Sequence, residues 1–317
     1  MAKCDVCNVR EAVVYQPHYS RKLCSGCFME DIKFRIKKQI EKYNMFDKRH
    51  KLLLGVSGGK DSFVLLDVLV ELHDPSKIIA LTIIEGVEGY NRDEEVERVK
   101  RYTRGYGVDS IIVSLKEEFG YRLDEIVRLA LKSGIDESPC TFCGVLRRRV
   151  LNTYARMVNA DRTVTAHNLD DEVQTIVINM IRGDYQRLLR GHPLAPKLSE
   201  RFVHKVKPMR EIYEWETALY AYIKGFTFQE TECPYINLRP TLRAKIRDIL
   251  YGLERNSPGA LYRILMEYDE MLLDDVKKLY DRPSLPTCRL CGEATSYGRD
   301  ICKTCEIFEN LGVKMLR

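Results

Sequence analysis

The chain has 317 residues, of which 45% are hydrophobic and 31% charged, and its formal net charge is +5. This balance is ordinary for a globular protein and excludes a disordered or fibrous chain. No stretch approaches the ~18 consecutive apolar residues of a membrane span, and the first residues lack the apolar core of a signal peptide, so we expect a cytoplasmic protein without a membrane partner. Eleven cysteines in such a chain favour metal ligation or sulfur chemistry over disulfides.

Both ends of the chain carry two Cys-x-x-Cys pairs. The N-terminal tetrad consists of Cys4, Cys7, Cys24 and Cys27, and the C-terminal tetrad of Cys288, Cys291, Cys302 and Cys305. Four thiolates suit tetrahedral zinc, and the x-x spacing lets both sulfurs of a turn face one ion. Because sulfur fills all four positions, we predict two structural zinc sites, each stabilising a segment too short to form its own core. A four-cysteine iron–sulfur cluster is the alternative.

Between the ends, short apolar runs alternate with longer amphipathic stretches, which is typical of βαβ units around a mostly parallel sheet in a doubly wound α/β fold. The predicted strands are residues 51–56, 78–84, 110–115 and 163–166. The predicted helices are residues 28–43, 61–72, 93–106, 144–158 and 171–181. Beyond about residue 204 the pattern becomes mainly helical, with helices predicted at residues 214–224, 242–253 and 260–272.

The first of these strands and the next helix are joined by the phosphate loop, which we define as Ser57-Gly58-Gly59-Lys60-Asp61-Ser62. Glycines let the backbone approach an anion, the helix N-terminus presents unpaired N–H groups, and Lys60 adds a positive charge. Asp61 can cap the helix or hold Mg²⁺, and Ser62 can contribute a hydroxyl. The spacing is not that of a Walker motif. The loop therefore predicts phosphate binding by an enzyme other than a conventional γ-phosphate hydrolase.

Three middle cysteines lie outside the tetrads: Cys140 and Cys143 precede a predicted helix, and Cys233 lies far downstream. Three thiolates are one short of a closed site. If they share an ion or cluster, one position is open for substrate, sulfide or water. The alternatives are a redox or zinc pair at Cys140 and Cys143, and a buried free Cys233.

The strand at residues 163–166 ends in the carboxylate turn, His167-Asn168-Leu169-Asp170-Asp171-Glu172. The carboxyl ends of strands hold ligands in doubly wound sheets. Helix capping explains one aspartate easily but two less well. We therefore expect a carboxylate here to bind the Mg²⁺ of ATP or to accept a proton.

The phosphate loop resembles the PP-loop of the ATP pyrophosphatase superfamily, whose members cleave ATP between the α and β phosphates and leave an adenylated substrate. With the carboxylate turn, the Cys-x-x-Cys pair, Glu232-Cys233-Pro234-Tyr235 and both tetrads in this order, nearly the whole chain resembles tRNA 2-thiouridine synthetases of the TtuA and NcsA type. The resemblance implies a PP-loop fold of the adenine nucleotide α-hydrolase kind. It divides the chain into an N-terminal zinc knuckle (1–30), an ATP-binding domain (31–205), a helical continuation (206–283) and a C-terminal zinc knuckle (284–317).

The resemblance also assigns roles to residues. It makes Cys140, Cys143 and Cys233 the ligands of a [4Fe-4S] cluster, and Lys60, Asp61 and Asp171 catalytic together with them. The implied ATP-binding residues are Val56, Ser57, Gly58, Gly59, Lys60, Asp61, Ser62, Ile83, Arg147 and Ala166. Relatives often have glycine where this chain has Ala166.

The implied reaction adenylates the C2 oxygen of a tRNA uridine and replaces it with sulfur. Residues 85–90, 140–148 and 179–184 look more like enzymes acting on the wobble uridine than like those acting on the T-loop uridine, which is the near alternative. The sulfur donor is either free sulfide or the thiocarboxylate of a ubiquitin-like carrier protein, and the family usually forms homodimers.

Basic residues concentrate beside the predicted site, and arginines suit phosphate and base contacts in tRNA. They are Arg147, Arg148, Arg149, Arg182, Arg187, Arg190, Arg239, Arg243, Lys245 and Arg247. A solvated helix face is the other interpretation of such runs. Two rival functions also remain: another PP-loop adenylating ligase, which leaves the middle cysteines unexplained, and a non-enzymatic zinc-ribbon RNA-binding module, which would bind tRNA without releasing AMP.

Overall fold

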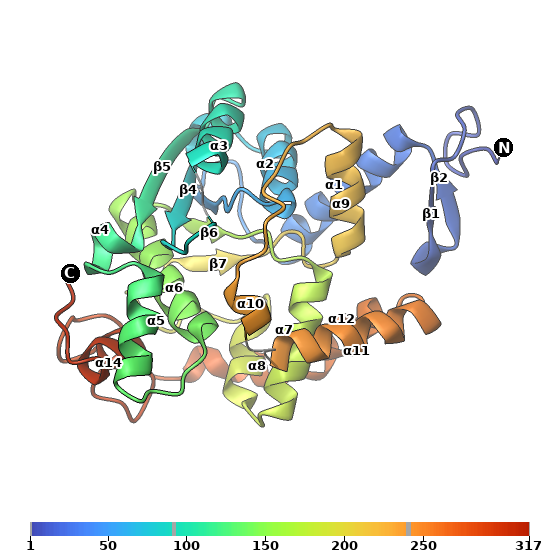
Figure 1. Ribbon diagram of the computed structural model, residues 1–317. Helices are drawn as coiled ribbons and strands as arrows, with labels where there is room; N and C mark the ends of the chain where they lie inside the picture. Colours follow the sequence, from blue (N-terminus) through green and yellow to red (C-terminus); the bar gives the residue numbers. More distant parts are fainter. Residues whose placement is uncertain (1, 91–92, 239–241, 317) are drawn as a thin grey trace.

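A five-stranded parallel sheet forms the centre of the computed structural model, which describes residues 2–90, 93–238 and 242–316 (Figure 1). The strand order is β5-β4-β3-β6-β7, and each neighbouring pair is parallel. The strands are β3 Leu52–Gly55, β4 Ile78–Ile84, β5 Asp109–Ser114, β6 Arg162–Val164 and β7 His204–Val206. The apolar run of β3 is fully buried from Leu52 to Leu54, as a central parallel strand covered on both faces requires.

Helices cover both faces of this sheet. Leu52 and Leu54 pack in one core with α1, α2 and α9, whereas Leu53 between them packs in a second core with α5, α6 and α14. These helices are α1 Ser25–Lys42, α2 Lys60–Leu72, α9 Glu214–Ile223, α5 Leu123–Lys132, α6 Pro139–Met157 and α14 Lys303–Asn310. The predicted doubly wound α/β fold is therefore confirmed.

The remaining elements extend this framework. α7 packs against α11 and α12 in a third apolar core beside the sheet. The other helices are α3 Asp93–Gly105, α4 Leu115–Phe119, α7 Leu169–Ile181, α8 Tyr185–Gly191, α10 Tyr235–Leu238, α11 Leu242–Asn256, α12 Ala260–Met271 and α13 Leu273–Lys277. Single 3₁₀ turns span Pro17–Tyr19, Pro75–Lys77 and Lys278–Asp281, and β1 Val14–Gln16 pairs with β2 Arg21–Leu23 in an antiparallel hairpin. No helix in the described ranges is long and apolar enough to cross a membrane.

Every strand and helix expected from the sequence is present; β4 has the expected ends, and each of the others differs at one or both ends by one to five residues. The largest difference is at α6, which was expected from Gly144 but begins at Pro139. Ser138 caps it by accepting the Cys140 N–H (3.3 Å), and proline suits the first helical position because its ring presets φ. Cys140 and Cys143 therefore lie in the first turn of the helix rather than before it.

Short elements escaped the sequence pattern. β7 opens the region expected to be mainly helical. The other strands and α-helices that were not predicted are β1, β2, α4, α5, α8, α10, α13 and α14. Two of the expected domain boundaries fall inside elements: residue 30 lies within α1, and residues 205–206 lie within β7. A strand of three residues is too short to show a periodicity, so only its pairing with β6 identifies it.

The two ends of the chain lie on opposite sides of the molecule (Figure 1). Buried acidic residues anchor both. Gln16 of the hairpin donates to Glu216 Oε1 (2.9 Å), which also accepts from Arg35 of α1 (2.5 Å). At the other end, Glu293 pairs with Arg156 and with Arg149 (3.2 Å), both on α6. The hairpin is thus attached by a hydrogen bond to a buried carboxylate that also pairs with α1, and the C-terminal module by ion pairs to α6.

Candidate functional site

The phosphate loop turns between β3 and α2 at the carboxyl edge of the sheet. Gly58 has a φ of +86°, a conformation that residues with a side chain rarely adopt. Ser57 Oγ accepts the Gly59 N–H (3.3 Å), and Ser62 Oγ donates to the Gly59 carbonyl oxygen (2.8 Å). These bonds hold the loop as a concave turn ahead of a helix N-terminus, which is the backbone arrangement that binds phosphate.

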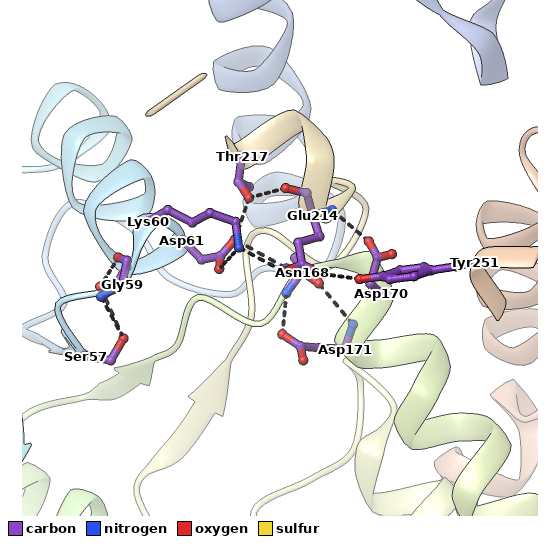
Figure 2. Close-up of polar contacts among 11 residues, drawn as sticks. Ser57, Gly59, Lys60, Asp61, Asn168, Asp170, Asp171, Glu214, Thr217 and Tyr251 are labelled. Atoms are coloured by element: carbon purple, nitrogen blue, oxygen red, sulfur yellow. Dashed lines mark hydrogen bonds and ion pairs between the residues drawn. The ribbon is translucent and has the colours of Figure 1, made fainter. Parts of the chain in front are cut away.

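Lys60 and Asp61 sit in a polar network whose residues come from α2, α7, α9 and α11 (Figure 2). Lys60 Nζ lies 2.9 Å from Glu214 Oε1 and 3.2 Å from Asp61 Oδ2. Burial disfavours the ammonium ion, but the two carboxylates outweigh it and raise the pKa of Lys60 above its ordinary value. Lys60 is therefore held charged at the entrance to the loop.

Asp61 is fixed from its other side. Its Oδ1 accepts the Thr217 hydroxyl (2.5 Å) and the Asn168 amide (3.3 Å), so α9 and the carboxylate turn both orient it. Tyr251 of α11 donates to Glu214 Oε2 (2.6 Å). Sequence reasoning missed Glu214, Thr217 and Tyr251. The helix at 214–224 was expected, but no local pattern indicated that its first turn faces the phosphate loop.

The carboxylate turn begins α7, and its capping is done by Asn168. Asn168 Oδ1 accepts the Asp171 N–H (3.0 Å), and Asp171 Oδ2 accepts the Asn168 N–H (3.4 Å). Asp170 points to α9, where its Oδ2 accepts the Glu214 N–H (2.7 Å). The alternative that an aspartate is present merely to cap the helix thus applies in part to Asp171 and not to Asp170.

Both aspartates have raised pKa values. Burial raises the pKa of Asp170 to about 7. Burial also raises the pKa of Asp171 to about 6, the nearby Asp61 adds to this, and Arg243 opposes it from 3.7 Å. Asp61 and Asp171 are thus close enough to repel each other electrostatically. Paired carboxylates beside a phosphate loop are a suitable donor set for a divalent cation.

The residues expected to contact nucleoside lie along the same edge. Val56 follows β3, Ile83 is near the end of β4, and Ala166 follows β6, so they occupy the carboxyl ends of three adjacent strands. Val56 is buried and donates its N–H to Leu81 O (2.9 Å). Arg147 reaches this edge from α6 and pairs with Glu85 (3.3 Å).

The middle cysteines converge from two distant segments. Cys143 and Cys233 both pack against the core that contains α5 and α6, and α10, which follows Cys233, packs on α6. Burial raises the pKa of Cys143 to about 12; the positive charge of Arg147 opposes the shift, while Cys233 and Cys140 add to it. The three sulfurs do not form a compact group like the two tetrads. A four-iron cluster is larger than a single metal ion. Three thiols that lie less close together than those of the tetrads, with the positive charge of Arg147 nearby, therefore fit a cluster of this size.

The two terminal tetrads are compact. Within each, the four sulfurs lie within 4.8 Å of one another. The residues after the first pairs, Asn8 and Gly292, both have positive φ, and their N–H groups both bond the carbonyl of the first cysteine at 2.9 Å. Cys24 and Cys302 cap α1 and α14. The N–H groups of Arg10 and Val9 lower the pKa of Cys7 to about 6, which favours the thiolate that zinc binds.

Basic residues gather near the carboxylate turn, including the predicted Arg147 and Arg243 and also Lys205 and Lys207, which were not predicted. The surrounding protein atoms lower the pKa of His167 well below its ordinary value although its side chain reaches solvent, and these four cations add to the shift. Arg148 and Arg187 are near enough to influence each other. Arg149 belongs elsewhere, since it pairs with Glu293 of the C-terminal module. Arg239 lies outside the described residues.

Comparison with known proteins agrees with this arrangement. A family model described as a PP-loop domain matches residues 29–250, and a model described as the N-terminal LIM domain of the 2-thiouridine synthetase TtuA matches residues 3–29. The chain is 32% identical to the tRNA 2-thiolation protein NcsA of Haloferax volcanii, over 98% of this chain and 99% of the relative. It is 34% identical to the cytoplasmic tRNA 2-thiolation protein 1 of Arabidopsis thaliana, over 97% and 84% of the two chains.

A solved structure is similar along its whole length. It is the U34-tRNA thiolase NcsA from Methanococcus maripaludis with its [4Fe-4S] cluster, which superimposes with a TM-score of 0.81 at 30% identity. The match covers 98% of this chain and 97% of that one.

Proposed function

Because the chain belongs to the PP-loop family that includes the tRNA 2-thiolation proteins, we propose that it is an ATP-dependent tRNA uridine 2-sulfurtransferase. The proposal keeps the wobble uridine as the substrate, in line with the U34 specificity of the similar solved structure. It also keeps a cytoplasmic location, which is the location that the name of the Arabidopsis relative gives for that protein.

The observation that carries the proposal is that the phosphate loop and the middle cysteines open on the same edge of the sheet. Arg147 links them, because it pairs with Glu85 after β4 and its charge acts on the Cys143 thiol. A second connection is the chain itself: Gln229 donates its N–H to Gly58 O (3.0 Å), and Cys233 follows four residues later. Four extended residues span at most ~14 Å. Adenylation and sulfur transfer can therefore act on one bound uridine.

In the first step, the phosphate loop binds the phosphates of ATP and Lys60 neutralises charge on them, while Asp61 and Asp171 are the carboxylates available for Mg²⁺. The uridine C2 oxygen attacks the α phosphorus, a P–O bond forms, and pyrophosphate leaves with the electrons of the α–β bond. In the second step, hydrosulfide or its equivalent forms a bond to C2, the C2–O bond breaks, and AMP leaves. The sulfur loses its proton to solvent or a base, so the net change is exchange of oxygen for sulfur with ATP converted to AMP and pyrophosphate.

Cys140, Cys143 and Cys233 are the proposed ligands of a [4Fe-4S] cluster. When bound by three protein thiolates, such a cluster supplies one iron position for the incoming sulfur. The chain's own contribution would be to hold the three thiolates and to keep Arg147 near Cys143, where its charge favours the thiolate. The two tetrads are proposed to hold structural zinc, with no position open for substrate.

The cations around His167 are the proposed contact for tRNA phosphates at the mouth of the site. Phosphate contacts position a nucleic acid and base contacts specify it, so these residues would orient the anticodon arm rather than select the uridine. A ubiquitin-like carrier as sulfur donor and a homodimer remain part of the proposal; support for both comes from resemblance to the family.

The test is an anaerobic assay of unmodified tRNA with ATP, Mg²⁺ and sulfide, in which AMP and 2-thiouridine are measured for the wild type, Lys60→Ala and Cys233→Ser. We expect the wild type to form both products, Lys60→Ala to form neither, and Cys233→Ser to form AMP without 2-thiouridine. Mapping the modified nucleotide then distinguishes the wobble uridine from the T-loop uridine. Full thiolation by Cys233→Ser would refute the role of the cysteines, and AMP without thiolation in the wild type would refute the substrate or donor.

A further inference from the structure

The third cysteine lies in a long irregular segment that needs anchors outside itself. We call residues 226–238, between α9 and the end of α10, the Cys233 segment; it runs from α9 down to α10 in Figure 1. Besides its bond to Gly58, a backbone turn from the Ile236 N–H to Cys233 O (3.0 Å) shapes it. That turn sets the local geometry of Cys233 but cannot determine its distance from α6.

A carboxylate on α5 also connects this segment to the rest of the site. Tyr235, two residues after Cys233, donates its hydroxyl to Asp124 Oδ1 (2.7 Å). The other oxygen of Asp124 accepts the Glu88 N–H (2.9 Å). Asp124 is the second residue of α5, where the positive end of the helix dipole stabilises its charge.

The loop that Asp124 holds is in turn bound to the helix of the other two cysteines. The Leu123 N–H donates to Glu85 O (2.8 Å), and the Glu85 carboxylate pairs with Arg147 of α6. Gly86 lets the loop approach this closely, because a Cβ there would lie 2.8 Å from the Arg122 side chain. Two hydrogen bonds and an ion pair, joined by short stretches of backbone, thus connect Cys233 through Tyr235, Asp124 and Glu85 to α6.

We propose that Tyr235 and Asp124 are positioning residues that hold Cys233 opposite Cys140 and Cys143. That this position of Cys233 serves a cluster rests on the proposed function. The position itself is independent of that function. A hydroxyl bonded to a charged carboxylate is among the stronger hydrogen bonds, so its loss should lower the population in which Cys233 faces Cys143 by about tenfold.

The experiment measures this proximity directly in iron-free, zinc-loaded full-length protein. A short bis-alkylating reagent bridges nearby thiols, and peptide mass spectrometry quantifies the Cys143–Cys233 product. Tyr235→Phe removes only the hydroxyl. Tyr222→Phe is the matched control. It also removes only a hydroxyl, but from a side chain on α9 that is 81% exposed.

We expect Tyr235→Phe to slow Cys143–Cys233 bridging by about tenfold and Tyr222→Phe to leave it unchanged. Asp124→Ala should slow it at least as much, and adding Tyr235→Phe to Asp124→Ala should have no further effect, because both changes break one interaction. Bridging at the wild-type rate in Tyr235→Phe, or additive effects in the double variant, would overturn the proposal.

Iron uptake on anaerobic reconstitution separates this proposal from the proposed function. If wild type binds iron and Tyr235→Phe binds less while nucleotide affinity is unchanged, both stand. If bridging depends on Tyr235 but the wild type takes up no iron, the positioning role stands and the cluster is refuted.

Discussion

Lys60 has two carboxylate partners, and the arrangement shows how it can exchange one for a phosphate. Glu214 Oε1 holds Lys60 while Glu214 Oε2 accepts the Tyr251 hydroxyl. When Lys60 turns toward an incoming phosphate, Glu214 therefore keeps a hydrogen bond and is not left as an unpaired charge. Asp61 does not move with it, because Thr217 and Asn168 hold its other oxygen.

Thr217 should therefore matter for adenylation. Thr217→Val keeps the shape but removes the hydroxyl that orients Asp61, and we expect kcat/KM for pyrophosphate release to fall roughly tenfold, the value of one hydrogen bond to a charged group. Thr217→Ser should restore most of the activity. Equal losses in the valine and serine variants would contradict an orienting role for the hydroxyl.

Asp170 predicts a pH dependence of stability. Its pKa in the folded protein, about 7, lies above the ordinary 3.8, so the stability associated with it is present below pH ~4 and is lost as pH rises toward ~7. Asp170→Asn can still accept the Glu214 N–H and carries no charge. We expect the variant to gain stability relative to wild type, on the order of a few kcal/mol, between about pH 5.5 and about pH 8.

The measurement is nucleotide-free urea unfolding of both proteins across that range. A difference between wild type and Asp170→Asn that does not change with pH would show that the carboxyl has an ordinary pKa.

α9 is the element through which the N-terminal module and the phosphate loop meet. One side of its first turn carries Glu214 and Thr217 toward the loop, and the other carries Glu216 toward Arg35 and Gln16. α9 is also fixed to α2, because buried Asp67 accepts the Tyr220 hydroxyl (2.6 Å). A displacement of this helix would therefore disturb the loop and the module together.

Glu216→Gln tests this attachment. Glu216 is fully buried, and neutralising it leaves Arg35 with Asp31 as its charged partner, so we expect a loss of about 3 kcal/mol in the free energy of unfolding. Glu71→Gln is the control, because it breaks the half-exposed pair with Lys33 and should cost less than ~1 kcal/mol. Similar small losses in both variants would show that the buried pair contributes little.

In the whole molecule, two similar metal knuckles occupy opposite sides of one α/β domain (Figure 1). Neither contributes a residue to the polar network of the phosphate loop, within the contacts of the described residues. Their separation suits a role in gripping an extended substrate such as tRNA while the central domain performs the chemistry.

Metal removal should therefore act locally. Cys7→Ser leaves three thiolates in the N-terminal tetrad, and we expect the chain to lose one zinc and to show faster hydrogen exchange in residues 2–24, while the C-terminal tetrad stays protected. Cys291→Ser should produce the converse pattern. Metal analysis with peptide-level exchange checks both variants, and undiminished zinc in Cys7→Ser would refute the predicted site.

Much of the fold followed from local patterns. The β3–phosphate loop–α2 unit was predicted nearly to its ends. An apolar run indicates the strand, the glycines indicate the turn and the next apolar pattern indicates the helix, all within a short stretch of sequence. β7, with three residues, carried no such signal. The start of α6 was placed five residues late because its cysteine-containing first turn lacks the apolar periodicity of the rest of the helix.

The sequence by itself determined the chemistry that is available: thiolate pairs at zinc spacing, a phosphate loop, a carboxylate turn and three further cysteines, because each is a short run whose residue types carry its function. Only the tertiary structure decided which of them meet. Glu214 reaches Lys60 across 154 positions and Tyr235 reaches Asp124 across 111. Such contacts depend on the order of strands in the sheet and on how the helices pack against it, and no local pattern of residues encodes them.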